Sequence, residues 1–105
     1  MREVNLEKFV AAQADGAVVI DVREPFEYAA GHVPGARLLP LSQVSVRAAE
    51  LPKDEPVYVI CATGNRSLVA ADYLARAGVD AWSVAGGTSE WQRSGRPVAW
   101  DRNAA

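Results

Sequence analysis

The segment CATGNRS, residues 61–67, contains the side chains of this chain that are best suited to covalent chemistry. Cys61, the only cysteine, comes directly after the apolar run 57–60, and Arg66 follows five positions later. Small residues and a glycine between them allow the backbone to curl, so that several N–H groups can point at the cysteine sulfur. A helix is expected to begin at Ser67, and its positive dipole end would add to this anion-binding concavity.

The predicted chemistry is nucleophilic attack by the thiolate of Cys61. A free thiol with a pKa of about 8.5 is only roughly 3% ionised at pH 7. Lowering the pKa by about two units, which corresponds to about 2.7 kcal/mol of stabilisation of the thiolate, makes the thiolate the majority form. Arg66 would support this charge and offer its guanidinium fork to an oxyanion. The alternative is that Cys61 is a small core hydrophobe, as lone cysteines usually are, but its position favours a nucleophile. The predicted loop after the cysteine comprises Ala62, Thr63, Gly64, Asn65, Arg66 and Ser67.

Strands that alternate with helices are expected to position this loop. The runs 18–20 and 57–60 are continuously apolar, which is typical of strands buried on both faces of a parallel sheet. Further strands are expected at 36–39 and 81–84, and helices at 6–10, 25–30, 42–50, 67–77 and 88–91. The predicted fold class is α/β, an open parallel sheet in a three-layer α/β/α sandwich. Sites in such sheets lie beyond the carboxyl ends of the strands, where Cys61 stands.

Two of these helices carry more detailed expectations. The apolar composition of 67–77 predicts a mostly buried helix that shows water only a narrow stripe and keeps Tyr73 in the core. Thr88 is expected to cap the last helix.

Length and composition favour a single domain over residues 1–105, with a core from about 4 to 98 and a frayed tail at 99–105. The net charge of −2 gives no broad basic field, so neither nucleic acid nor a membrane is expected as a partner. One cysteine and one histidine, His32, cannot supply a Cys/His zinc site, and we expect no metal or cofactor. Without a signal peptide or membrane span in the sequence, a cytoplasmic location is expected.

Three motifs together resemble the rhodanese family of sulfurtransferase domains: VVIDVREPFEYAAGHVPGA (18–36), CATGNRS (61–67) and VAGGTSEWQRSGRPV (84–98). The resemblance implies a rhodanese-like fold. It also implies that Cys61 attacks the outer sulfur of thiosulfate, or of a persulfide donor, and carries the sulfur as a persulfide. Cyanide, a small thiol or a thiol of a partner protein would then take the sulfur. Backbone N–H groups of residues 62–66 would hold the persulfide anion.

The resemblance also places five supporting residues around the loop. Asp21 is expected to accept hydrogen bonds from a turn, and Arg23 to hold an acidic partner. His32 is expected to pin a turn through hydrogen bonds rather than to act as a general base. Gly86 and Gly87 would form a turn close behind the loop, where a Cβ atom would intrude.

Two alternatives stay open at this point. The first is a non-enzymatic sulfur carrier or regulatory docking module, as catalytically silent members of the family are. The second is a cysteine phosphatase or arsenate reductase. Their related loop has five residues between cysteine and arginine, whereas here residues 62–65 make four. The shorter ring should cradle one sulfur and crowd a phosphoryl group, which favours sulfur transfer. Ala62 and Thr63 are neutral where many members carry a basic residue, so the affinity for dianionic thiosulfate is expected to be modest.

Overall fold

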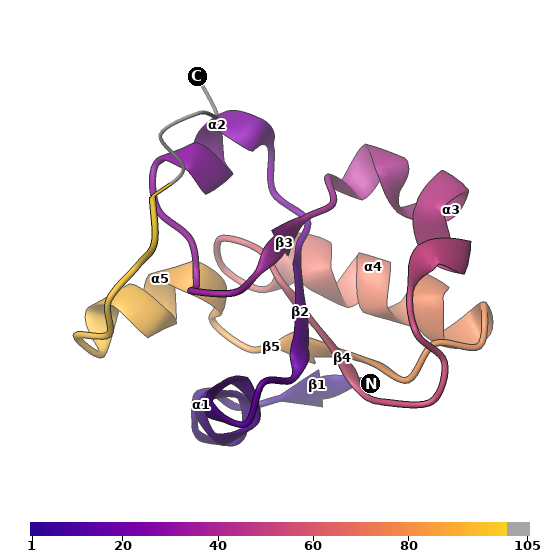
Figure 1. Ribbon diagram of the computed structural model, residues 1–105, viewed down its shortest axis with the longest axis horizontal. Coiled ribbons are helices and arrows are strands. Elements are labelled where there is room, and N and C mark those ends of the chain that lie inside the picture. Colours follow the sequence, from indigo (N-terminus) through magenta and orange to yellow (C-terminus); the bar gives the residue numbers. More distant parts are fainter. Residues whose placement is uncertain (101–105) are drawn as a thin grey trace.

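The computed structural model describes residues 1–100 and shows a five-stranded sheet flanked by helices (Figure 1). The strands are β1 (Glu3–Val4), β2 (Val18–Asp21), β3 (Arg37–Leu38), β4 (Val57–Ile60) and β5 (Ala81–Val84). All pairings are parallel, and the order across the sheet is β1-β5-β4-β2-β3. The predicted α/β class with an open parallel sheet is therefore confirmed.

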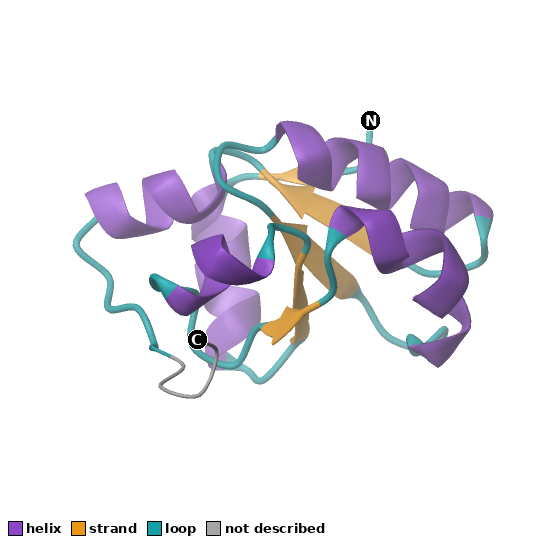
Figure 2. Cartoon of the chain, turned by 90° about the horizontal axis from the view of Figure 1, so that it is seen from above, coloured by secondary structure: helices purple, strands orange, loops and turns teal. Residues whose placement is uncertain are grey.

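Helices cover both faces of the sheet. They are α1 (Leu6–Ala14), α2 (Pro25–Ala29), α3 (Val44–Arg47), α4 (Asn65–Arg76) and α5 (Gly87–Arg93). Short 3-10 turns at Leu41–Gln43 and Ala48–Glu50 flank α3, so the single helix expected over 42–50 is divided into three pieces. One core packs α3 and α4 against the sheet, and a second core packs α1 and α5 against the opposite face. The view from above shows helices on both sides of the sheet (Figure 2).

The central strand β4 contributes to both cores because successive side chains of a strand point to opposite faces. Val57 and Val59 belong to the core beneath α4, whereas Tyr58 and Ile60 belong to the core beneath α1 and α5. All four residues are buried. This two-sided burial explains why the run lacks the alternation of a half-exposed strand, and it fixes the end of β4 firmly in the middle of the sheet.

The start of each helix that follows a glycine was misplaced by the sequence interpretation. Helix α4 begins at Asn65, two residues before the expected Ser67, because Gly64 adopts a left-handed φ of 108° and takes the N-cap position. Gly86 does the same for α5 with a φ of 78°. Thr88 is consequently a buried residue of the first turn of α5, and the prediction that it caps the helix is wrong.

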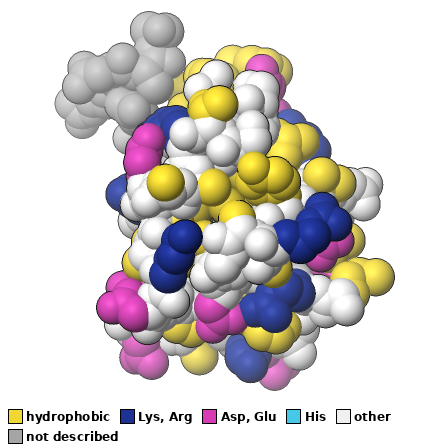
Figure 3. All heavy atoms as spheres, turned by 90° about the vertical axis from the view of Figure 1, so that its right-hand side faces the viewer, with side chains coloured by type: hydrophobic (Ala, Val, Ile, Leu, Met, Phe, Trp, Pro, Cys, Tyr) yellow, Lys and Arg dark blue, Asp and Glu magenta, His cyan; other side chains and the backbone are white. Residues whose placement is uncertain are grey.

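Helix α4 is also more exposed than its composition predicts. Val69 and Tyr73 are 61% and 40% exposed, so the expected burial of all but a narrow stripe is wrong. The helix lies on the sheet along one side only, and its outer side borders a hollow of about 240 Å³ beside α3. Figure 3 shows hydrophobic side chains on this face of the molecule, interspersed with lysine and arginine. The hollow is lined by Leu41, Val44, Ser45, Val69, Ala70 and Tyr73.

The end of the described chain folds back onto the turn after α2. Ala99 pairs with His32 through two backbone hydrogen bonds, with N···O distances of 3.0 and 2.8 Å. A frayed tail was expected from residue 99, and this expectation is wrong at Ala99; residues 101–105 lie outside the described part of the chain. None of the described helices is long and apolar enough to cross a membrane.

Candidate active site

Cys61 lies at the carboxyl end of β4, between the ends of the neighbouring strands β2 and β5. Its side chain belongs to the core beneath α4, and the residue is only 1% exposed. The chain then turns sharply into α4, so the sulfur faces the N-terminus of a twelve-residue helix. This is the location at which open parallel sheets carry their sites.

The sulfur of Cys61 is held by hydrogen-bond donors from the loop. The N–H of Gly64 donates to Sγ at 3.0 Å, and the Cys61 thiol donates to Ser67 Oγ at 3.4 Å. When the thiol loses its proton, the Ser67 hydroxyl becomes the donor in this contact. Burial raises the pKa of the Cys61 thiol, but the Ser67 hydroxyl and the N–H groups of Ser67, Gly64 and Thr63 lower it by more. The net result is a pKa below that of an ordinary thiol. The loop therefore stabilises the thiolate, through residues 63, 64 and 67 rather than through the whole of 62–66.

A second buried hydroxyl supports this arrangement from the neighbouring strand. Ser83 in β5 lies with its Oγ 2.7 Å from Ser67 Oγ, and both residues are fully buried. When Ser83 donates to Ser67, the proton of Ser67 is free to point at the sulfur of Cys61. The sequence analysis missed Ser83, although a serine within the apolar strand AWSV was a visible signal.

The start of α5 packs directly behind the cysteine loop. Thr88 donates to the carbonyl oxygen of Cys61 from its N–H at 2.8 Å and from its Oγ1 at 3.1 Å, and the Ser89 N–H donates to the Ala62 carbonyl at 3.0 Å. A Cβ atom on Gly87 would lie 2.4 Å from the Cys61 carbonyl oxygen, and the residue has a φ of +56°. A Cβ atom on Gly86 would instead meet Glu90 of α5, so the predicted intrusion into the loop is confirmed for Gly87 and not for Gly86.

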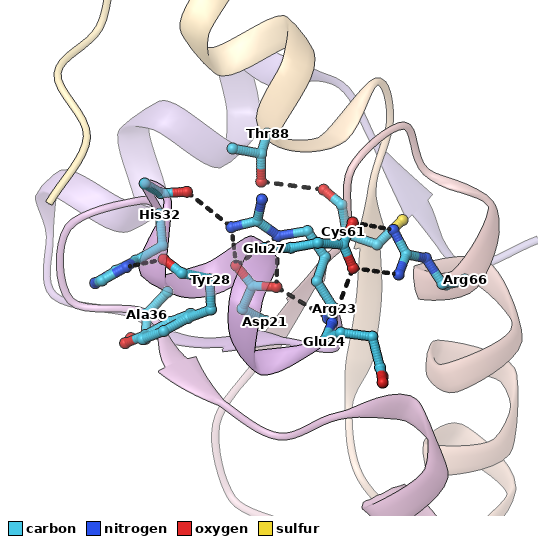
Figure 4. A network of polar contacts seen from close by, with 11 residues as sticks. Asp21, Arg23, Glu24, Glu27, Tyr28, His32, Ala36, Cys61, Arg66 and Thr88 are labelled. Atoms are coloured by element: carbon cyan, nitrogen blue, oxygen red, sulfur yellow. Dashed lines mark hydrogen bonds and ion pairs between the residues drawn. The ribbon is translucent and has the colours of Figure 1, made fainter. Parts of the chain in front are cut away.

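Asp21 and Arg23 form a buried ion pair at the end of β2. Arg23 Nε lies 3.0 Å from Asp21 Oδ1, Nη2 lies 2.8 Å from Oδ2, and the Arg23 backbone N–H also donates to Oδ1. Arg23 Nη2 further donates to the Gly31 carbonyl at 2.9 Å. The predicted contacts are present, and the acidic partner of Arg23 is Asp21 itself. The pair ties the end of β2 to the turn after α2 (Figure 4).

His32 is fixed in that turn. Its Nδ1 lies 2.9 Å from the Tyr28 carbonyl oxygen, and its ring stacks on the ring of Tyr28 at a centroid distance of 3.6 Å. Its backbone pairs with Ala99. These contacts agree with the expected pinning of the turn and leave the imidazole engaged away from Cys61 (Figure 4).

Arg66 is held by a residue that the sequence analysis did not identify. Its Nη1 and Nη2 atoms donate to the two carboxylate oxygens of Glu27, at 2.8 and 3.0 Å. Glu27 belongs to α2, and the hydrogen bonds from Arg66 lower its pKa to about 2 despite partial burial. The guanidinium thus lies beside Cys61 but extends toward α2 (Figure 4). Within residues 1–100, no three histidine, cysteine or acidic residues gather where a metal ion could bind.

A buried cysteine at the carboxyl edge of a parallel sheet, with its thiol pKa lowered by loop donors and a helix N-terminus behind it, is the arrangement of a cysteine-dependent group-transfer domain of the α/β class. The family model described as the rhodanese-like domain matches residues 5–94. The chain belongs to the rhodanese-like family.

Known proteins of similar sequence and structure agree with this assignment. Thiosulfate sulfurtransferase GlpE of Pseudomonas entomophila is 40% identical over 94 residues, which cover 87% of this chain and 84% of that protein. A protein named sulfurtransferase from Allochromatium vinosum is 35% identical, with 83% and 82% covered. The crystal structure of a rhodanese-related protein from Thermoplasma volcanium superposes with a TM-score of 0.89 at 33% identity, covering 96% of this chain and all of that one.

Proposed function

We propose that the protein is a sulfurtransferase that transfers the sulfane sulfur of thiosulfate, or of a persulfide donor, to cyanide or a thiol through a persulfide on Cys61. The observation that carries the proposal is the cradle of donors from Gly64 and Ser67 around the Cys61 sulfur, which favours the thiolate. The relatives named as sulfurtransferases support the same reaction.

In the first step the Cys61 thiolate attacks the outer sulfur of the donor. With thiosulfate, a new S–S bond forms to Cys61, the S–S bond of the donor breaks, and sulfite leaves with the bonding electron pair. Three negative charges are present before and after the transfer, and no oxidant or reductant is needed. The N–H groups of Thr63, Gly64 and Ser67, which lower the pKa of Cys61, are the donors we expect to stabilise the new sulfur anion.

In the second step an acceptor attacks the terminal sulfur of the persulfide. Cys61 is now the leaving group, and the donors that lower its pKa stabilise the departing thiolate as well as the attacking one. The same cradle therefore serves both half-reactions, and no separate general base is required. The acceptor is cyanide, a small thiol or a thiol on a partner protein. A free nucleophilic thiol suits a reducing compartment, in keeping with a cytoplasmic location.

The proposal is tested by intact-protein mass spectrometry before and after incubation with thiosulfate, together with an assay for released sulfite. The wild type should gain the mass of one sulfur atom and release one sulfite per chain, and Cys61→Ser should gain nothing. Because the chain has one cysteine, the site of loading is unambiguous. A gain in Cys61→Ser, or no gain with either thiosulfate or an organic hydropersulfide, would contradict the proposal and favour a docking module.

A further inference from the structure

The ion pair between Arg66 and Glu27 changes the charge that a sulfur donor meets at the site. Both terminal nitrogens of Arg66 are directed at the carboxylate, at 2.8 and 3.0 Å. A guanidinium in this two-point geometry presents its hydrogen-bonding fork to its partner and not to an approaching ligand. The contact joins α2 to the start of α4 and spans 39 positions of the sequence, so it is a product of the fold.

The other charges near Cys61 do not compensate for this pairing. Asp21 and Arg23 neutralise each other. The loop positions 62–65 carry no formal charge. Arg66 and Glu27 cancel each other's charge. In the thiolate form of Cys61 that attacks the donor, the site therefore carries a net charge of about −1. A dianion is repelled by this charge, whereas a neutral donor is not.

We propose, on the basis of the sulfurtransferase function above, that Glu27 sets donor specificity: by occupying Arg66, it selects sulfur donors of low negative charge, the organic hydropersulfides R–S–SH, over dianionic thiosulfate. Glu27 acts through Arg66 and is a positioning residue. The transfer it favours is balanced. The Cys61 thiolate attacks the outer sulfur of R–S–SH, the donor S–S bond breaks, and R–S⁻ leaves, while the proton stays on the transferred sulfur. One negative charge is present before and after.

The test compares two donors, thiosulfate and 2-hydroxyethyl hydropersulfide, whose organic group is uncharged. The rate of sulfur loading on Cys61 is followed by mass at several donor concentrations. Glu27→Gln keeps a hydrogen-bond acceptor for Arg66 but removes the charge. It should raise the thiosulfate rate constant about tenfold, mainly through a lower KM. With the hydropersulfide the change should stay below about twofold. Glu27→Asp keeps the charge and should keep the donor ratio near that of the wild type.

Glu55→Gln is the matched control, because Glu55 is exposed and precedes the opposite end of β4. It changes the net charge equally and should leave both rates unaltered. A second measurement needs no variant: added salt should speed thiosulfate loading of the wild type, because screening weakens repulsion. A donor ratio unchanged in Glu27→Gln, or slower thiosulfate loading at high salt, would overturn the inference. Loading of the wild type by neither donor would instead overturn the sulfurtransferase function itself.

Discussion

Among the hydrogen bonds of residues 1–100, Ser67 provides the only side-chain hydroxyl in contact with the Cys61 sulfur. Ser67→Ala removes this hydroxyl and leaves the backbone donors in place. A hydrogen bond to a charged group contributes about 1.5–3 kcal/mol. Sulfur is a weaker hydrogen-bond acceptor than oxygen, which places this one near the lower value. The substitution should raise the pKa of Cys61 and lower the thiolate-to-thiol ratio about tenfold at a given pH below the new pKa.

The same substitution has a separate cost in stability. Ser83 loses the partner that lies 2.7 Å away, and its buried hydroxyl is left without the hydrogen bond. An unsatisfied buried group of this kind costs about 1–3 kcal/mol. Adding Ser83→Ala removes the stranded hydroxyl, so the double variant should regain much of the lost stability while its thiol stays less acidic. Ser83→Ala alone keeps Ser67 and should shift the pKa less than Ser67→Ala does.

The assay is the rate of alkylation of Cys61 by iodoacetamide as a function of pH, with urea unfolding measured in parallel. The single cysteine makes the reaction specific. The midpoint of the rate profile should move to higher pH in Ser67→Ala and in the double variant by the same amount. A midpoint equal to that of the wild type would refute the reasoning, since it would show that the backbone N–H groups of residues 63, 64 and 67 account for the acidity of the thiol.

Two further predictions concern the packing behind the loop and the ion pair beside it. Gly87→Ala should destabilise the fold by about 3 kcal/mol or more, since strain at positive φ adds to a clash with the Cys61 carbonyl. Gly95→Ala is the control, because its new Cβ shares the strain of a positive φ, +85°, but meets no atom within 4 Å. An equal loss of unfolding free energy in both variants, measured in urea, would show that the clash does not contribute. Glu27 has a pKa of about 2 in the folded state, below that of a glutamate in the unfolded chain. The ion pair with Arg66 therefore stabilises the fold fully above the unfolded-state pKa of Glu27, and this stabilisation is lost as the pH falls toward 2. Between pH 4.5 and pH 2, the free energy of unfolding measured in urea should therefore fall more for the wild type than for Glu27→Gln. The difference should be less than about 1 kcal/mol because the pair is partly solvated. An equal fall in both proteins would disprove the linkage.

The part of the site that could be predicted from the sequence rests on local signals. The apolar run of β4, the cysteine at its end and the glycine in the loop lie within a few positions of one another, and their chemistry follows from that order. The close packing of Gly87 was foreseeable from the family resemblance, which places the paired glycines behind the loop.

The remaining contacts depend on elements that only the fold brings together. Ser83 reaches Ser67 across 16 positions, and Glu27 reaches Arg66 across 39, so neither pairing leaves a periodic pattern in the sequence. The exposure of Val69 and Tyr73 was misjudged for a related reason. An Ala/Leu-rich composition permits burial of a helix, but the number of elements packed around it decides how much of it is covered.

The two shortest strands of the sheet, β1 and β3, are its two edges, and each has two residues. An edge strand offers unpaired N–H and C=O groups to other chains, and long exposed edges are the usual starting points of aggregation. Here the four-residue strands are all interior, and each edge presents only a few free groups. Within residues 1–100, the fold therefore gives a second molecule little template for adding a strand. Substitutions that lengthen β1 or β3 would create this liability even if they left the cysteine loop untouched.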